Sequence, residues 1–400
     1  MLRQAQHDVL LCPAPLSVHM HVAVNTRFLL PGAHLEGIGR FSYETLIRLV
    51  AQQPDVTFHF LFDRAYDARY LFGPNVVPHV LLPAARHPFL YVAWFEGAVA
   101  RWLARRRPAA FLSLDGFTTL NTRVPRVTVL HDLAFEHFPL DVDLLTRKYY
   151  QFFTPRFARA SAQVVVVSEA TKADVVKTYG LAPGKISVAY NAPAELFQPQ
   201  PAAAQREIRR QFSHGQPYFL FVGALQPRKN LGNLLRAFDQ FKTAHSPAAA
   251  DVQLLIVGRK AWKAGPILEA YQQMRHQTAV HFTGRVADAE LAGLYAAALA
   301  TVYVPYFEGF GIPIVEAQAS GCPVLTANLS SMPEVAGPGG ALLVDPHDAA
   351  SIAAGLAKLC QDSALRQQLI ARGHENLSRF SWARSAEVLW EAIDAALNEE

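Results

Sequence analysis

The stretch Ala300-Thr301-Val302-Tyr303-Val304-Pro305-Tyr306-Phe307-Glu308-Gly309-Phe310-Gly311-Ile312-Pro313-Ile314-Val315-Glu316 reads as a strand, a glycine loop and the start of a helix that continues to Ser320. The apolar, β-branched run at its beginning predicts the strand. Gly309 and Gly311 allow backbone N–H groups to approach a ligand without interference from a Cβ atom, and Pro313 suits a first helical turn. Because a helix N-terminus attracts phosphate, the stretch predicts a phosphate-binding loop.

Two carboxylates frame this loop, because Glu308 precedes the helix and Glu316 lies one turn inside it. Their separation suits a ligand with hydroxyl groups at both ends, such as a nucleotide sugar. Glu316 would then accept the ribose hydroxyls, the loop amides would face the diphosphate, and Glu308 would reach the sugar. The alternative is an ordinary strand-to-helix turn with a solvated glutamate, since glycine-rich turns of this kind are common.

The residues between the two glutamates make the pattern more specific. Glu308 and Glu316, with Gly309, Phe310, Gly311 and Pro313 between them, resemble the E-x7-E motif of the retaining glycosyltransferases of family 4. Three further segments are similar to the bacterial mannosyltransferase-type branch of that family: Gly258-Arg259-Lys260-Ala261-Trp262, Phe282-Thr283-Gly284-Arg285-Val286 and Ser331-Met332-Pro333-Glu334-Val335-Ala336-Gly337. The resemblance covers nearly everything from Met20 to Leu397. It implies an α/β protein of GT-B architecture, in which two Rossmann-like, doubly wound parallel-sheet domains face a cleft.

Composition excludes several other classes of protein. The 400 residues are 51% hydrophobic and 18% charged, which indicates a globular chain that is too long for one core. The net charge of +4 is mild and no long basic run is present, so a nucleic-acid partner is not expected. Three scattered cysteines, Cys12, Cys322 and Cys360, indicate neither a disulfide framework nor a zinc site, and we expect a cytoplasmic protein. No apolar run reaches the ~18 to 20 residues that a spanning helix needs.

Alternating strand-like and helical runs predict two parallel α/β domains. Residues 1–19 are expected to be a disordered extension, and Met20 is a second candidate for the start. Residues 20–195 are expected to form the acceptor domain and residues 196–380 the donor domain, joined by a linker at residues 199–204. Residues 381–400 carry an apolar stripe at helical spacing, and the resemblance implies that this last helix crosses back onto the first domain. The stripe consists of Trp382, Ala386, Leu389, Trp390, Ile393 and Leu397.

The first domain offers a glycine loop and a histidine. The strand His21 to Thr26 is followed by Glu36-Gly37-Ile38-Gly39, which lacks the third glycine of the dinucleotide fingerprint. The resemblance implies that Gly37 and Gly39 lie over the donor diphosphate, although Glu36 replaces the family's usual first glycine. His131-Asp132 follows a predicted strand, where open sheets place their ligand crevice, and the resemblance implies that His131 contacts the donor sugar. His131 could instead cap a loop, and Ser168 is expected to be a helix N-cap.

The second domain offers glycines and a basic pair. The predicted strands that end at Gly223, Gly258 and Gly284 leave their carboxyl edge open to a nucleotide. Arg228 and Lys229 stand beside a predicted helix start, where two cations and free amides could hold a diphosphate; the plain alternative is a solvated surface pair. The resemblance implies that this pair binds the donor diphosphate and that residues after Gly284, here Arg285 and Val286, frame the base. The loop amides from Gly309 through Phe310 and Gly311 to Ile312 complete the expected donor site.

Residues 89–107 combine aromatic side chains with arginines. The segment contains Phe89, Tyr91, Trp94, Phe95 and Trp102 together with Arg101, Arg105, Arg106 and Arg107. One interpretation is an interfacial helix on the anionic inner face of the plasma membrane. The other is a core-packed helix whose arginines favour its carboxyl end, and the two can hold together.

These observations predict a retaining, metal-independent hexosyltransferase. Glu308, His131, Arg228 and Lys229 are the expected catalytic residues. No cofactor and no metal ligand are expected, because the two cations and the loop amides could stabilise the leaving-group charge without a metal ion. On family likeness the donor is expected to be GDP-mannose, then UDP-glucose or another UDP-sugar, and the acceptor a saccharide or lipid-linked saccharide of surface polysaccharide or glycolipid. A phosphorylase, an epimerase or a non-catalytic nucleotide-sugar-binding protein remains as the alternative. The residues leave open the linkage, the oligomeric state and the choice between double displacement and front-face attack.

Overall fold

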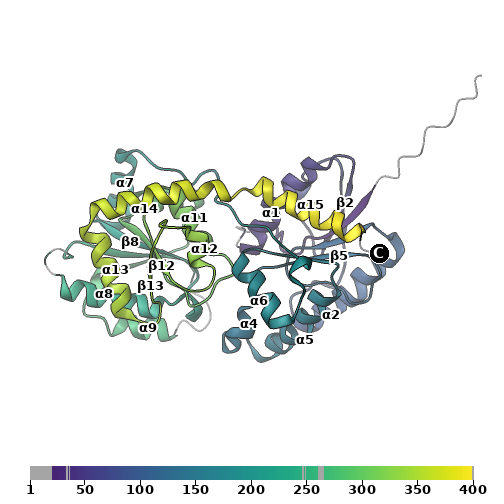
Figure 1. The fold of residues 1–400 in the computed structure, drawn as a ribbon, viewed down its shortest axis with the longest axis horizontal. Helices are drawn as coiled ribbons and strands as arrows, with labels where there is room; N and C mark the ends of the chain where they lie inside the picture. Colours follow the sequence, from purple (N-terminus) through teal and green to yellow (C-terminus); the bar gives the residue numbers. More distant parts are fainter. Residues whose placement is uncertain are drawn as a thin grey trace, which may run out of the picture.

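The computed structural model describes residues 20–398, apart from residues 33, 34, 36, 246, 248 and 260–264. The expected extension 1–19, Glu36 and Lys260-Ala261-Trp262 therefore lie outside the described residues. Two parallel sheets, one in each half of the chain, lie side by side with helices on their faces (Figure 1). The α/β, two-domain prediction is confirmed.

The first domain has a seven-stranded parallel sheet in the order β3-β2-β1-β4-β5-β6-β7. The strands β4, β5 and β6 are almost wholly buried, because helices cover both faces and leave room only for continuous apolar runs. The strands are β1 (His21–Asn25), β2 (Thr57–Phe62), β3 (Val76–Val80), β4 (Ala110–Ser113), β5 (Arg126–Leu130), β6 (Gln163–Val166) and β7 (Ile186–Val188). The helices are α1 (Gly37–Gln52), α2 (Pro88–Val92), the π-helical η2 (Ala93–Val99), α3 (Ala100–Arg106), α4 (Ala134–His137), α5 (Leu144–Ala160) and α6 (Glu169–Tyr179), with short 3-10 turns at Ala68–Tyr70, Pro139–Asp141 and Pro183–Lys185.

The second domain has a six-stranded parallel sheet in the order β10-β9-β8-β11-β12-β13. The order reverses between β8 and β11, which is where open α/β sheets form their ligand crevice. The strands are β8 (Tyr218–Val222), β9 (Gln253–Val257), β10 (Val280–Gly284), β11 (Ala300–Tyr303), β12 (Val324–Ala327) and β13 (Leu342–Val344). The helices are α7 (Ala202–Ser213), α8 (Leu231–Ala244), α9 (Gly265–Gln272), α10 (Asp288–Ala297), α11 (Ile312–Ala319), α12 (Met332–Ala336), α13 (Ala349–Gln361) and α14 (Ser363–Asn376), with 3-10 turns at Pro227–Lys229, Gln277–Ala279 and Leu377–Arg379.

The last helix, α15 (Trp382–Asn398), leaves the second domain and packs against α1 and the first sheet (Figure 1). Its apolar stripe explains this position, because Trp382, Ala386, Leu389 and Ile393 are buried there. The Ser385 hydroxyl also donates to the Tyr190 carbonyl of the first domain. The chain thus crosses between the domains twice.

Some local predictions need correction. Gly37 and Gly39 belong to the first turn of α1 and not to a loop before it, and Ala202, placed in the predicted linker, begins α7. The segment 89–107 is not one amphipathic helix: it is divided into α2, η2 and α3, and Trp94 and Phe95 are fully buried. Trp94 donates its indole N–H to the Leu81 carbonyl at 2.7 Å, so it is core and cannot enter a membrane. Among the described residues, no helix is both long and apolar enough to cross a membrane.

Candidate active site

The glycine loop lies between β11 and α11, and Gly311 is the N-cap of the helix with φ of 98°. This left-handed conformation favours glycine, and a Cβ atom here would also lie 2.7 Å from Cε of Met332. The Ser331 hydroxyl is within hydrogen-bond distance of the carbonyls of Glu308 and Phe310, at 2.9 and 2.8 Å. These contacts hold the loop so that its amides remain at the N-terminus of α11.

Gly309 is the point at which the two domains touch most closely. A Cβ atom on Gly309 would lie 1.7 Å from the His131 carbonyl oxygen, so only glycine fits. The Gly309 carbonyl accepts hydrogen bonds from Ser168 Oγ at 2.6 Å and Thr171 Oγ1 at 3.0 Å, both at the start of α6. Ser168 Oγ also accepts from the Thr171 amide, so it is the expected N-cap and an interdomain contact as well. The sequence carried no signal for this second role.

Glu308 forms a compact cluster with both predicted cations. Its Oε1 lies 2.8 Å from Arg228 Nη1 and 2.5 Å from Lys229 Nζ, and Lys229 also donates to the Tyr303 hydroxyl at 2.8 Å. Burial alone would raise the pKa of Glu308, but Arg228 and Lys229 hold it below the usual range, so the carboxylate is ionised. Burial lowers the pKa of Lys229, and the charge of Glu308 opposes that shift. With both cations protonated, the cluster carries one net positive charge at the edge of the glycine loop.

Glu316 has a different environment, although it is also buried. Its Oε2 accepts a hydrogen bond from the Tyr295 hydroxyl at 3.0 Å, and burial raises its pKa to about 7. The favourable charge of Arg40 is opposed by that of Asp288, and these two residues form a 2.7 Å ion pair between α1 and α10. Glu316 is thus a carboxylate whose charge changes near neutral pH.

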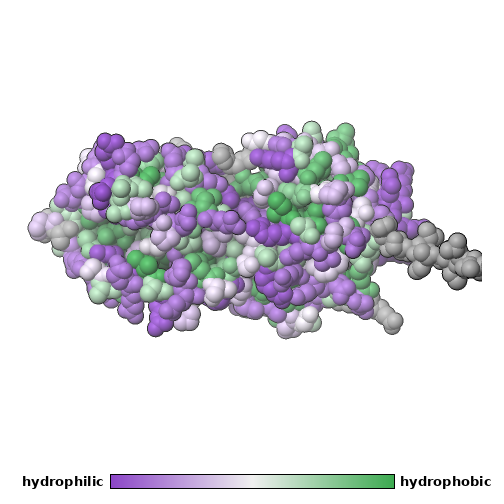
Figure 2. Space-filling view, turned by 90° about the horizontal axis from the view of Figure 1, so that it is seen from above, coloured by the Kyte–Doolittle hydropathy of each residue, from purple (hydrophilic) through white to green (hydrophobic). Residues whose placement is uncertain are grey.

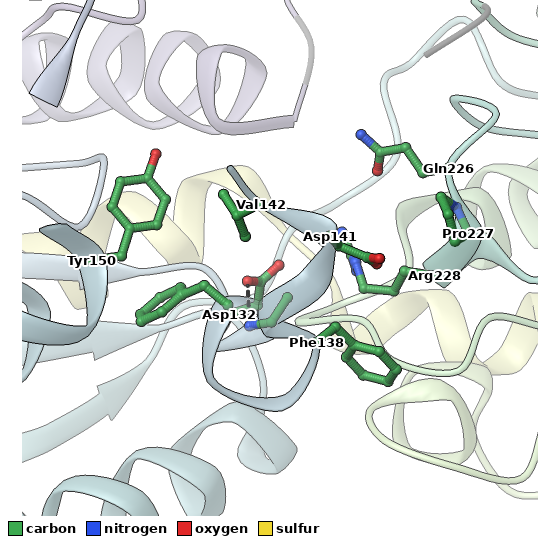
Figure 3. A pocket seen from close by; sticks show the side chains of 10 residues that line it. Asp132, Phe138, Asp141, Val142, Tyr150, Gln226, Pro227 and Arg228 are labelled. Carbon is green, nitrogen blue, oxygen red and sulfur yellow. Dashed lines mark hydrogen bonds between the residues drawn. The ribbon is translucent and has the colours of Figure 1, made fainter. Parts of the chain in front are cut away.

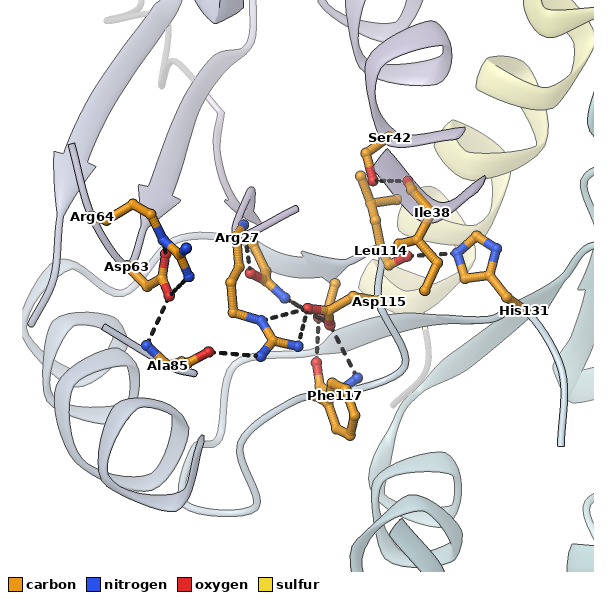
Figure 4. Close-up of polar contacts among 12 residues, drawn as sticks. Arg27, Ile38, Ser42, Asp63, Arg64, Ala85, Leu114, Asp115, Phe117 and His131 are labelled. Atoms are coloured by element: carbon orange, nitrogen blue, oxygen red, sulfur yellow. Dashed lines mark hydrogen bonds and ion pairs between the residues drawn. The ribbon is translucent and has the colours of Figure 1, made fainter. Parts of the chain in front are cut away.

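His131 follows β5 and is held in one orientation (Figure 4). Its Nε2 lies 2.8 Å from the Leu114 carbonyl, which can only accept, so Nε2 carries the proton. Burial lowers the pKa of His131, which leaves the ring neutral with Nδ1 as an acceptor. Beside Leu114, the buried Asp115 pairs with Arg27 at 2.9 Å and fixes the ends of β1 and β4 (Figure 4).

The strand-end glycines of the second domain also lie together. A Cβ atom on Gly258 would lie 1.9 Å from the Gly223 carbonyl oxygen, and the Gly258 amide donates to the Gly284 carbonyl at 2.9 Å. Arg285 is exposed and Val286 half-buried immediately after β10. The structure brings these glycines together at the carboxyl edge of β8, β9 and β10, as a nucleotide site requires.

A pocket of about 170 Å³ opens between the domains beside Arg228 (Figure 3). Asp132, Asp141, Phe138 and Tyr150 line it from the first domain. Sequence reasoning identified Arg228 and Asp132, but it did not anticipate the other three residues.

Two facing Rossmann-like domains, with a glycine loop framed by two buried glutamates between them, define a GT-B protein. Residues 35–192 match the model of Glycosyltransferase Family 4, and residues 204–376 match that of Glycosyl transferases group 1. The chain belongs to the family 4 glycosyltransferases, and within that family it is mannosyltransferase-like.

Relatives with assigned names support the same placement. O-antigen chain mannosyltransferase B of Escherichia coli is 28% identical over 64% of this chain and 66% of its own length. The MMP alpha-(1->4)-mannosyltransferase of Mycolicibacterium hassiacum is 29% identical over 60% of this chain and 56% of its own length. The match thus spans about half to two thirds of these relatives.

Solved structures share the fold over nearly the whole chain. Sucrose-phosphate synthase from Thermosynechococcus elongatus aligns with a TM-score of 0.73 at 20% identity, covering 93% of this chain and 98% of that one. Anabaena HepE, solved in complex with UDP and glucose, aligns with a TM-score of 0.68 at 18% identity, covering 94% of this chain and all of that one, 100%. At these identities the likeness establishes the fold alone.

Proposed function

We propose that this protein is a retaining glycosyltransferase that moves a hexose, in the first place mannose from GDP-mannose, to a saccharide or lipid-linked saccharide acceptor in the synthesis of surface polysaccharide or glycolipid. The observation that carries the proposal is the cluster of Glu308, Arg228 and Lys229 beside the N-terminus of α11. A sugar diphosphate placed there meets one net positive charge and free backbone amides. The names of the mannosyltransferase relatives favour mannose, whereas HepE with UDP and glucose is the reason to keep UDP-glucose as the second donor.

In this proposal each site residue has its own role in the transfer. The bond between the anomeric carbon and the β-phosphate oxygen breaks, and the nucleoside diphosphate leaves with the electron pair. Arg228, Lys229 and the loop amides stabilise that charge, and preorganised donors typically contribute ~3 to 4 kcal/mol each. Glu308 orients the sugar, while His131 presents Nδ1 as an acceptor to a sugar hydroxyl near the reacting carbon. The acceptor hydroxyl attacks from the face of the leaving group, and its proton passes to the departing phosphate oxygen.

The proposal includes independence from a metal ion. Two cations and the helix N-terminus supply the positive charge that a divalent ion would otherwise bring. Among the described residues, no three His, Cys, Asp or Glu side chains converge as a metal site. Activity that survives an excess of chelator supports this part of the proposal, and activity restored only by a divalent cation contradicts it.

Release of nucleoside diphosphate tests the function directly. The protein is incubated with GDP-mannose, UDP-glucose and other sugar nucleotides, with and without saccharide acceptors, and the anomeric configuration of the product is read by NMR. We expect GDP to be released from GDP-mannose and the α-configuration of the donor to be kept. A protein that binds nucleotide sugar but never turns it over would be the non-catalytic alternative, and an inverted product would refute retention.

We also propose that the protein works at the anionic inner face of the plasma membrane. Apolar side chains are exposed on the first domain at Leu82 and Phe89, which are 71% and 69% accessible. Arg101, Arg105 and Arg106 border the same groove as Leu82. A lipid-linked acceptor would be met at such a surface.

A further inference from the structure

We propose that the pocket between Asp141 and Arg228 is the acceptor subsite and that it takes an uncharged, hydroxyl-rich sugar ring in preference to a phosphorylated or carboxylated one. The inference rests on the proposed glycosyl transfer and specifies which acceptors that reaction uses. Its basis is the chemistry of the pocket wall, which no sequence motif revealed.

The position of the pocket suits an acceptor. It lies between the two domains, and its wall includes Asp132, which directly follows His131, and Arg228, which contacts Glu308 at 2.8 Å. A group held there is therefore next to both the predicted sugar contact and the predicted leaving-group contact. Its volume of about 170 Å³ far exceeds the ~10 to 15 Å³ that one water molecule needs, so a sugar ring has room.

Two carboxylates of the first domain determine which ligand atoms fit. Asp132 Oδ1 accepts from the Ala134 amide at 2.9 Å, which leaves Oδ2 for a ligand. In the described part of the chain, the Asp141 carboxylate accepts no hydrogen bond, although Asp141 is only half-exposed and lines the pocket. Ionised carboxylates are acceptors only, so the ligand must offer donors such as hydroxyl groups. A phosphate or carboxylate offers none and is repelled.

Aromatic side chains form part of the remaining wall, beside Ala134, Val142, Gln226 and Pro227. Phe138 and Tyr150 line the pocket from either side of Val142 (Figure 3). Phe138 is held by Phe307 of the second domain, with ring centroids 6.0 Å apart, and Tyr150 by Phe135 at 5.3 Å. Flat apolar rings beside a few hydroxyl-binding groups suit the two kinds of surface that a pyranose ring presents.

Arg228 is the cation of the pocket wall, and the proposed function assigns it to the donor diphosphate. Its guanidinium already donates to the Phe307 carbonyl at 2.6 Å and to Glu308 at 2.8 Å. The negative charges of Asp132 and Asp141 also favour the protonated form of Arg228 by raising its pKa. The three ionised groups of the wall therefore sum to one net negative charge, which disfavours a phosphorylated acceptor.

The test compares acceptors in the presence of the donor that the wild-type protein turns over. The panel pairs neutral methyl glycosides (mannoside, glucoside, galactoside, rhamnoside) with the corresponding 6-phosphates and uronates. We expect transfer to at least one neutral glycoside, and we expect Asp141→Asn to raise its KM about tenfold. Asp143→Asn is the matched control, because Asp143 is exposed, N-caps α5 two residues away and is well replaced by asparagine as a cap. Nucleoside diphosphate affinity shows that each variant keeps a folded donor site.

Two kinds of failure can be told apart. If the wild-type protein releases no nucleoside diphosphate from any sugar donor, the proposed function itself is wrong. The subsite assignment alone is overturned if the wild-type protein releases the diphosphate but transfers only to anionic sugars or to none of the panel. It is also overturned if the acceptor KM of Asp141→Asn equals that of Asp143→Asn.

Discussion

At the scale of a single residue, we propose that Glu316 couples donor binding to pH. Its pKa is raised from 4.5 to about 7 by burial, so the folded protein keeps a proton that the unfolded chain loses. Stability from this difference is fully present below pH 4.5 and is lost as pH rises towards 7, by roughly 3 kcal/mol in total. By contrast, the ionised carboxylate is the better acceptor of hydrogen bonds from the ribose hydroxyls.

The two trends have opposite signs, and Glu316→Gln tests both. Wild-type affinity for the nucleoside diphosphate should increase as pH rises from 6 to 8, while thermal stability falls as pH rises from 5 to 7. The Gln variant should bind ~1 to 3 kcal/mol more weakly at pH 8 and show neither trend. Calorimetric titration and melting curves across this pH range are the measurements. Unchanged affinity at pH 8 would remove Glu316 from the donor site.

The Arg228 and Lys229 pair is expected to act mainly in the transition state. Arg228→Ala with Lys229→Ala should lower turnover at saturating donor more than donor affinity, because the leaving-group charge grows only during the reaction. The double change also leaves the buried Glu308 carboxylate with the Tyr303 hydroxyl but without a cationic partner, which typically costs ~3 to 5 kcal/mol. Melting temperature is therefore measured beside the rate.

A triple variant that adds Glu308→Gln separates these effects, since it restores a neutral cluster without restoring the cations. Glu308→Gln alone is the reference, because Glu308 is itself a proposed catalytic residue. Recovered stability with turnover well below that of this single variant agrees with the catalytic role of the cations. Equal losses of affinity and of kcat/KM, with kcat intact, would reduce the pair to a ground-state anchor.

Single residues could be proposed from the sequence where a local pattern marked them. Glu308, Glu316 and Arg228 stand beside glycines or a helix start, and His131 follows a strand. Their partners could not be proposed, because Tyr295 reaches Glu316 from another helix and Leu114 reaches His131 from another strand. Hydrogen bonds between residues so far apart in the chain produce no recognisable spacing pattern in the sequence. The roles of the site residues themselves stay predictions.

At the scale of elements, the fit of the glycine loop against the end of β5 is the tightest contact. Gly309→Ala would place a Cβ atom 1.7 Å from the His131 carbonyl, and a backbone atom cannot turn aside as a side chain can. We expect kcat/KM to fall at least about 100-fold, since a displacement of ~1 Å near the reacting centre has effects of that size.

Gly232→Ala provides the control for that variant. Gly232 lies in α8 and a Cβ atom there meets nothing within 4 Å. This change should leave activity intact and add ~0.5 to 1 kcal/mol of stability through helix propensity. Wild-type activity of Gly309→Ala would mean that the loop does not need to approach His131.

Elements with strong patterns were predictable, and those shaped by packing were not. Buried strands such as β6 appear as continuous apolar runs. The edge strand β3 was not predicted, because Pro78 interrupts its pattern and it pairs only with β2. The division at Ala93–Val99 also escaped prediction: its π-helical turn contains the buried Trp94 and Phe95 and Gly97, and no sequence pattern marked it.

At the scale of the molecule, polar contacts from several elements fix one domain on the other. Glu334 of α12 accepts hydrogen bonds from the Glu169 and Ala170 amides at the N-terminus of α6, both at 2.8 Å. Arg40 pairs with Asp288 on α10, and α15 packs along the first domain (Figure 1). The face drawn in Figure 2 is uneven as well, with hydrophobic areas among the polar ones.

One groove of about 540 Å³ is lined by both apolar and basic side chains of this segment, among them Val80, Leu82, Trp102, Arg101, Arg105 and Arg106. This position makes the membrane proposal sharper than the sequence did. Burial of Trp94 and Phe95 removes them from any lipid contact, so we expect insertion mainly from Leu82 and Phe89, the most exposed apolar side chains of this segment. Attraction to an anionic leaflet adds roughly 1 kcal/mol per basic residue and weakens with salt. We therefore expect the protein to sediment with anionic liposomes at low salt.

The decisive comparison separates this surface from charge in general. One variant changes Arg105, Arg106 and Arg107 to Ser, and a second changes Leu82 and Phe89 to Ser. A control variant changes the exposed second-domain residues Arg206, Arg210 and Arg275 to Ser, which removes the same charge elsewhere. We expect the first two variants to lose most binding and the control to keep it, because only the first two alter the surface that carries both apolar groups and arginines. If the wild type and the variant changed at Arg105, Arg106 and Arg107 bind the anionic liposomes equally at low salt, the membrane proposal is wrong. Residues 89–107 then serve only as core and solvated surface.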